Sequence, residues 1–93
     1  MSIFRKLVDE EIVRVRAKNG GVKGWHEAYG LLAEEVEEFW DEVKKKTSKR
    51  DRANALRELV QIAGLCERIA VDLDLTASTE PMTFQRKAVM LQP

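Results

Sequence analysis

Residues 25–43, WHEAYGLLAEEVEEFWDEV, carry two patterns that decide the expected fold of this 93-residue chain. The first pattern is a row of apolar side chains at alternating three- and four-residue spacings, which is the period of one face of an α-helix. This row consists of Trp25, Tyr29, Leu32, Val36, Phe39 and Val43. The lysines at 44–46 follow the row and suit the negative end of a helix dipole. The stretch therefore predicts an amphipathic helix with a continuous apolar seam.

Helical spacing also occurs before and after this stretch. In residues 2–18 the apolar side chains recur at three- and four-residue intervals, at Phe4, Leu7, Val8, Ile12 and Val15. The sequence Asn-Gly-Gly at 19–21 tolerates left-handed backbone and predicts the end of that first helix. After the second helix, a polar loop offers Thr47, Ser48 or Asp51 as the cap of a third helix.

The third helix is expected from about Arg52 to Leu73, and it differs from the others because apolar residues cover most of its circumference. These residues are Leu59, Val60, Ile62, Ala63, Leu65, Cys66, Ile69 and Ala70. A helix of this kind is buried on several sides, and three helices in one small chain do not easily surround it. The sequence therefore predicts an all-α fold, a helical bundle of three main helices that is completed by homodimerisation.

The periodicity weakens after the third helix. Polar residues followed by Pro81 are typical of a helix start with proline in the first turn, and they predict a short fourth helix through Val89. A loosely ordered tail is the alternative. We therefore expect one helical domain over residues 1–73 and a short helix or tail over residues 74–93.

The composition limits the classes of partner and site. Acidic and basic residues number 16 each, so no net charge attracts the chain to nucleic acid or to an anionic membrane. The apolar runs are much shorter than the roughly 18 residues of a membrane-spanning helix, and we expect a cytoplasmic protein without a membrane partner. A single cysteine, Cys66, and a single histidine, His26, cannot form a zinc cluster of the Cys/His kind. A bound metal would be held by carboxylates, which favours Mg²⁺, with Mn²⁺ as the alternative.

The second pattern of residues 25–43 is acidic. Its carboxylates are Glu27, Glu34, Glu35, Glu37, Glu38, Asp41 and Glu42. Several of them follow one another at four-residue spacing, and each like-charged pair of this kind costs roughly 0.2–0.5 kcal/mol in an isolated helix. A bound divalent cation would remove this cost. The simpler alternative is a solvated acidic face.

Two polar pairs lie beside the apolar rows of the second and third helices. Glu35 stands at the border of the seam with Glu38 one turn further along, and Glu58 and Gln61 have the same spacing in the third helix. A carboxylate at a packing border must be hydrated, paired or metal-bound, because burying it alone is costly. If the two helices pack antiparallel, the four side chains can face one another across one pocket and converge on a cation.

These residues are similar to the motifs of the MazG-type, all-helical nucleoside triphosphate pyrophosphohydrolases, which carry EExxE on one helix and ExxD on the next. The first motif is present as EEVEE at residues 34–38. The second is present as ELVQ at residues 58–61, with Gln61 in place of the usual aspartate. The resemblance extends from about Phe4 to Leu73.

The resemblance implies a magnesium-dependent enzyme that hydrolyses a nucleoside triphosphate to the monophosphate and pyrophosphate, and that assembles as a homodimer or a tetramer. Carried over by position, Glu35, Glu38 and Glu58 would be metal ligands, and Gln61 would occupy the fourth ligand position. Glu34 or Glu35 would accept the proton of the attacking water. Because an amide oxygen brings no charge, weaker metal binding is the expected consequence of Gln61.

Contacts to the substrate are expected from two further groups. Arg57 in the third helix and Lys46 in the basic loop would contact the triphosphate, although a solvated basic loop accounts for the same charges. Trp25 and His26 would border the base, with the alternatives that Trp25 belongs to the core and that His26 is an ordinary polar residue. The competing hypotheses are a non-catalytic nucleotide-binding or helical dimerisation module, in which Gln61 marks a decayed site, and a helical adaptor without a ligand.

Overall fold

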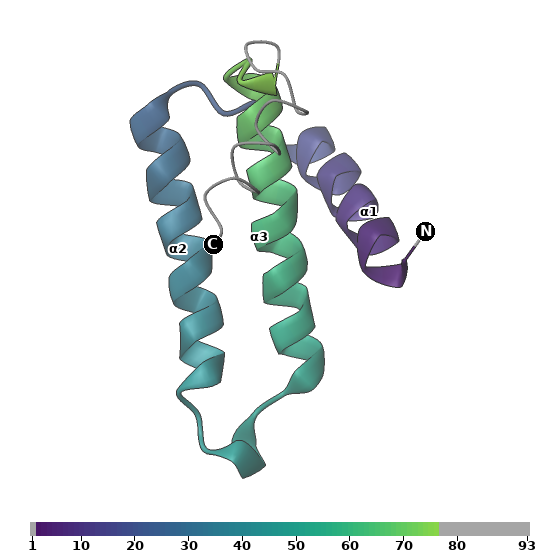
Figure 1. Ribbon diagram of the computed structural model, residues 1–93, viewed down its shortest axis with the longest axis vertical. Coiled ribbons are helices and arrows are strands. Elements are labelled where there is room, and N and C mark those ends of the chain that lie inside the picture. Colours follow the sequence, from purple (N-terminus) through teal and green to yellow (C-terminus); the bar gives the residue numbers. More distant parts are fainter. Residues whose placement is uncertain (1, 77–93) are drawn as a thin grey trace, which may run out of the picture.

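The computed structural model describes residues 2–76, which form three α-helices and one short 3₁₀ helix (Figure 1). The elements are α1 (Ile3–Lys18), α2 (Trp25–Val43), η1 (Thr47–Lys49) and α3 (Arg52–Asp72). No strand occurs among these residues, which confirms the expected all-α class. None of the helices in this part of the chain combines the length and the apolar character that crossing a membrane requires. The expected fourth helix or tail falls mainly on residues 77–93, outside the described residues.

Local hydrogen bonds explain where the helices begin. Ser2 caps α1 and Asp51 caps α3, because each side chain accepts hydrogen bonds from backbone N–H groups of the first turn. Asp51 is therefore the cap among the three predicted candidates. No side chain caps α2, but Glu27 in its first turn accepts the backbone N–H of Lys23 at 2.7 Å. This bond ties the linker between α1 and α2 to the start of α2.

The end of α3 is a Schellman motif. Asp74 has the left-handed conformation, with φ of 59°. The backbone N–H groups of Asp74 and Leu75 donate to the carbonyl oxygens of Val71 and Ala70. These bonds satisfy carbonyl groups that the helix end leaves without partners. Glycine is the usual residue at this position, and aspartate is one of the few others that tolerate it.

α3 lies between the other two helices and contacts both (Figure 1). It runs antiparallel to α2, and α1 packs against another of its sides. The buried residues Val22, Ala28 and Leu65 form the core, with Leu32, Ile69 and Leu73 packed against them. α1 packs against α3 at Gly64, where a Cβ atom would lie in ordinary van der Waals contact, 3.5 Å from the side chains of Glu11 and Ile12.

Only part of the predicted apolar seam of α2 is packed: Leu32, Phe39 and Val43 are half-buried, and the rest is exposed. Ala28 is buried in the core, whereas Trp25, Tyr29 and Val36 are 68%, 75% and 49% exposed. At about 100° per residue, these three side chains and Trp40 fall within about 60° of the helix circumference. The apolar arc of α2 is therefore broader than one interface, and only one edge of it faces α3. The prediction that Trp25 and Tyr29 belong to the core is wrong for the single chain.

α3 is also less enclosed than expected. Val60 and Leu65 are buried, but Leu59 is 40% exposed and Cys66 is exposed. The reason is that α1 and α2 cover two sides of the helix and leave a third, apolar side open. Cys66 lies on that open side and is exposed, although its place in the apolar stretch of the third helix predicted burial.

Candidate metal centre and adjoining cavity

Three carboxylates converge where α2 faces α3. Glu35 and Glu38 lie one turn apart on α2, and Glu58 lies on α3. One oxygen atom of each falls within 4.8 Å of the others. Three of the four predicted ligand positions are therefore brought together by the antiparallel packing of the two helices. We refer to Glu35, Glu38 and Glu58 as the acidic cluster.

The acidic cluster sits at the border of the interface between the helices. Glu35 and Glu58 are half-buried, whereas Glu38 is exposed. The Oε2 atoms of Glu35 and Glu58 are shielded from solvent and accept no hydrogen bond within residues 2–76. Buried carboxylate oxygens without partners are costly, and such atoms call for a donor or a cation. The residues therefore fit a divalent ion held by carboxylates.

Burial and mutual repulsion change the acidity of the cluster. Burial, followed by the negative charges of Glu38 and Glu58, raises the pKa of Glu35 from 4.5 to about 7. Burial also raises the pKa of Glu58, with a further contribution from the charge of Glu38. At neutral pH the cluster thus holds more negative charge than its surroundings stabilise. A divalent cation between the carboxylates would reverse both effects.

Glu42, one turn beyond Glu38, is an acidic residue with a different environment. It is 2% exposed and accepts hydrogen bonds from the backbone N–H of Asp51, Nζ of Lys45 and Nδ2 of Asn54, at 2.7, 2.9 and 2.7 Å. These donors, the Asp51 N–H first, lower the pKa of Glu42 from 4.5 to about 2. Glu42 therefore joins α2, the loop and α3, and it is satisfied without a ligand.

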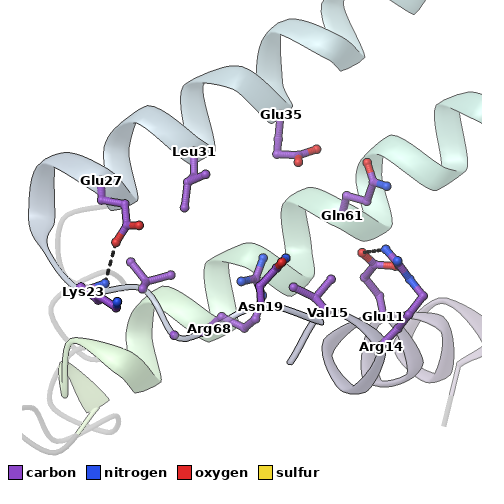
Figure 2. A pocket seen from close by; sticks show the side chains of 13 residues that line it. Glu11, Arg14, Val15, Asn19, Lys23, Glu27, Leu31, Glu35, Gln61 and Arg68 are labelled. Atoms are coloured by element: carbon purple, nitrogen blue, oxygen red, sulfur yellow. Dashed lines mark hydrogen bonds and ion pairs between the residues drawn. The ribbon is translucent and has the colours of Figure 1, made fainter. Parts of the chain in front are cut away.

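A cavity of about 460 Å³ adjoins the acidic cluster on the side of the α1–α2 linker. Its polar lining includes Arg14, Lys23, Glu27, Glu35, Gln61 and Arg68. Figure 2 shows Glu35 on α2 and Gln61 on α3 directed into the space between these helices. Glu35 thus belongs both to the cluster and to the cavity wall, and Gln61 borders the cavity one turn beyond Glu58. The fourth predicted ligand is placed near the other three.

Two residues predicted to act at the site lie apart from the acidic cluster. Glu34 is exposed and is not one of the three clustered carboxylates. Arg57 is exposed and donates from Nη1 to Oδ1 of Asn54 at 2.6 Å. Its charge is close enough to lower the pKa of Glu58 slightly against the effect of burial, but its side chain does not line the cavity.

The remaining predicted substrate contacts lie at the two ends of α2. Trp25 and His26 are exposed in its first turn, and Lys46 is exposed in the loop that follows it. The 19 residues of α2 span roughly 30 Å. Trp25 and His26 therefore lie at the opposite end of α2 from Lys46, with the acidic cluster between them.

The sequence interpretation missed the cations that line the cavity. They come from three segments: Arg14 from α1, Lys23 from the linker and Arg68 from α3. Arg68 follows Gln61 by seven residues, which places both on one face of α3. This spacing is a signal that the sequence contains. Arg14 and Lys23 have no such signal, because their positions depend on how α1 and the linker pack against α3.

Comparison with protein-family models, with curated proteins and with solved structures found no match. The chemistry of the cluster and of the cavity beside it is therefore the basis for a functional assignment.

Proposed function

We propose that this chain is a metal-dependent nucleoside triphosphate pyrophosphohydrolase of the MazG type, which converts a nucleoside triphosphate and water to the monophosphate and pyrophosphate. The observation that carries the proposal is the convergence of three carboxylates within 4.8 Å. Two of their oxygen atoms are buried without a hydrogen-bond partner in residues 2–76. The motifs EEVEE at 34–38 and ELVQ at 58–61 support the same reaction through their resemblance to that family.

The residues of the site have two proposed roles, holding the metal ion and accepting a proton, and Glu35 takes part in both. Glu35, Glu38 and Glu58 hold Mg²⁺ or Mn²⁺, with the amide oxygen of Gln61 as a fourth donor. The ion would neutralise the polyphosphate and lower the pKa of an attacking water. Glu35 borders both the cluster and the cavity, so it is better placed than the exposed Glu34 to accept a proton from water in the cavity.

We also propose that two copies pair through the open apolar side of the α2–α3 hairpin. The exposed side chains on α2 are Trp25, Tyr29, Val36 and Trp40. At the loop end of the same hairpin, a groove of about 700 Å³ between the two helices has Phe39, Val43, Leu56 and Leu59 in its wall. Large contiguous apolar surfaces mark interaction sites. A second copy of the hairpin would cover this surface and complete a four-helix bundle.

Product analysis tests the enzymatic proposal. Purified protein is incubated with a panel of ribo- and deoxyribonucleoside triphosphates, with Mg²⁺, with Mn²⁺ and with EDTA. We expect monophosphate and pyrophosphate in equal amounts, and only when metal is present. The rate of product formation should be at least a hundredfold lower in Glu38→Gln, because losing a metal-site group of this kind costs several kcal/mol of transition-state stabilisation. The matched control is Glu37→Gln, which changes an exposed neighbour outside the cluster. Folded wild-type protein that releases no product from any triphosphate would refute the proposal.

The neutral side chain of Gln61 supports a second candidate, a module that binds a nucleotide without hydrolysing it. The Gln61→Asp variant separates the two candidates, because it restores the charge that the related motif carries. A large gain in turnover would show that the natural site is weakened. A loss of turnover would show that glutamine is part of a working site, and binding without turnover in both proteins would favour the module.

A further inference from the structure

The cavity next to the acidic cluster is lined by charged groups of both signs. Three cations border it, Arg14, Lys23 and Arg68, together with the carboxylates of Glu11, Glu27 and Glu35. A ligand that reaches the acidic cluster through the cavity must pass Glu35, which belongs both to the cluster and to the cavity wall. Whatever extends from a bound cation into the cavity therefore meets these charged groups.

Most of the charged groups in the cavity already have partners. Arg14 forms a two-point contact with Glu11, with Nη2 to Oε2 at 2.8 Å and Nε to Oε1 at 3.2 Å. Glu27 accepts the backbone N–H of Lys23 at 2.7 Å. Arg68 differs from Arg14, because its guanidinium group donates no hydrogen bond to another group of residues 2–76, and its charge acts only at longer range on Asp72, whose pKa it helps to lower.

Arg68 is placed to use its donors inside the cavity. It is half-buried on α3, on the same face as Gln61, and Figure 2 shows its side chain extending from α3 into the space bordered by α2 and the linker. A guanidinium group carries five N–H donors, and two of them match a pair of phosphate oxygens. A half-buried guanidinium group with unused donors is therefore suited to a phosphate group.

Gln61 adds a second donor to the same wall. An amide has an oxygen that can face a cation and an NH₂ group that can donate to an anionic oxygen, whereas an aspartate at this position could only accept. It would also add a negative charge beside that of Glu35. The substitution that removes charge from the metal site thus makes the adjoining cavity more favourable for an anion.

Two backbone N–H groups of the linker already have partners. The N–H of Val22 donates to Oδ2 of Asp72 at 2.7 Å, and that of Lys23 donates to Glu27. These two groups are therefore not available to an anion, and only the N–H groups of Gly20 and Gly21 could add to the side-chain donors from this segment. Among residues 2–76, no aromatic side chain lines the cavity, so within this part of the chain the surface on which a base would stack lies elsewhere.

From these observations we propose that the cavity is the subsite for the terminal phosphates of the substrate, which leave as pyrophosphate, and that Arg68 and Gln61 contact their oxygens. The inference rests on the proposed function, because it places the phosphates next to a metal ion at the cluster. It differs from the sequence prediction, which assigned the triphosphate to Arg57 and Lys46.

Binding of inorganic pyrophosphate, measured by calorimetry in the presence of Mg²⁺, tests this subsite without requiring turnover. Arg68→Gln is expected to weaken binding by about 10- to 100-fold, the usual effect of losing a charged hydrogen bond. Arg68→Lys keeps the charge but not the paired donors, so its affinity for pyrophosphate should lie between those of the wild type and Arg68→Gln. Arg5→Gln, on exposed α1 surface away from the cavity, is the matched control and should bind as the wild type does. The Gln61→Asp variant should bind pyrophosphate more weakly than the wild type and Mn²⁺ at least as tightly.

The outcomes separate this inference from the proposed function. Equal pyrophosphate affinity in wild type, Arg68→Gln and Arg68→Lys would overturn the subsite, even if triphosphates are hydrolysed. Affinity that depends on Arg68, in protein that hydrolyses no nucleotide, would support the subsite and refute the enzyme. Binding of Mn²⁺ by each variant verifies that the helices still assemble, and Arg68→Lys preserves the test if Arg68→Gln does not fold.

Discussion

Replacing Glu35 by glutamine keeps the shape of the side chain and removes a charge that the metal-free protein does not stabilise. A pKa raised from 4.5 to about 7 corresponds to at most about 3 kcal/mol of unfavourable free energy when the group is ionised. Because Glu35 is only half-buried, solvent screening reduces this value, and we expect about 1 kcal/mol. Glu35→Gln should therefore be more stable than the wild type at pH 8 in EDTA.

The sign of this effect depends on pH. Below pH 4.5, Glu35 is protonated in both the folded and the unfolded protein, so the charge costs nothing. Between pH 4.5 and about 7 the unfolded chain releases this proton while the folded chain keeps it, so the free energy of unfolding falls as pH rises. Above pH 7 the loss is complete. The difference between Glu35→Gln and the wild type should thus be near zero at pH 4.5 and greatest at pH 8.

Urea unfolding in EDTA at pH 4.5, 6 and 8 measures the difference. For a small domain, about 1 kcal/mol moves the urea midpoint by roughly 0.5–1 M. The matched control, Glu37→Gln, alters an exposed residue outside the cluster and should show no such pH dependence. With Mn²⁺ the order should reverse, because the ion stabilises the carboxylate that the variant lacks. The reasoning is refuted if Glu35→Gln is less stable than the wild type at pH 8 in EDTA.

Four further outcomes are expected. Mn²⁺ should increase the free energy of unfolding of the wild type by mass action, by about 2–3 kcal/mol at a hundredfold excess over its dissociation constant, and so raise its melting temperature; the melting temperature of Glu38→Gln should stay nearly unchanged in differential scanning fluorimetry. The pKa of Glu42 is lowered to about 2, so its contribution to stability is present above pH 4.5 and lost as pH falls toward 2. Glu42→Gln should therefore have a lower melting temperature at pH 7, measured by circular dichroism, and this melting temperature should fall less between pH 4.5 and pH 2 than that of the wild type. Asp74→Gly should stabilise the protein by about 0.5–1 kcal/mol in urea unfolding, because glycine accepts the left-handed conformation without a steric cost. Tyr29→Lys should convert a dimer to a monomer in light scattering, and a wild type that is already monomeric would contradict the proposed pairing.

The extent of the helices follows from local sequence. The apolar spacing, the Asn-Gly-Gly at 19–21 and the cap Asp51 predict boundaries that agree with α1, α2 and α3. These features act over one or two turns, because a cap or a helix-ending residue works through its own hydrogen bonds and dihedral angles. The spacing of Glu35 and Glu38 and the order of the two motifs likewise predicted which carboxylates converge, once the two helices were taken to be antiparallel.

The different fates of the acidic residues depend on the tertiary structure. Glu38 and Glu42 have the same four-residue spacing as Glu34 and Glu38, yet Glu42 meets three donors from the loop and α3, and Glu34 meets solvent. The identity of these neighbours is set by segments that are distant in sequence or by the orientation of the helix. Periodicity alone therefore identified an acidic row but not which of its members are available to a ligand.

The same distinction applies to the apolar face of α2 and to the cavity. Helical periodicity shows that the apolar arc exists, but only the packing of α3 decides that Ala28 is covered while Trp25 and Tyr29 are exposed. The cations of the cavity come together because α1 approaches α3 at Gly64 and the linker is held by Asp72. Secondary structure is determined by interactions within a few residues, and the sequence suffices for it. Burial, pKa values and the composition of a cavity depend on which remote side chains share a space, and that is decided by the assembled helices.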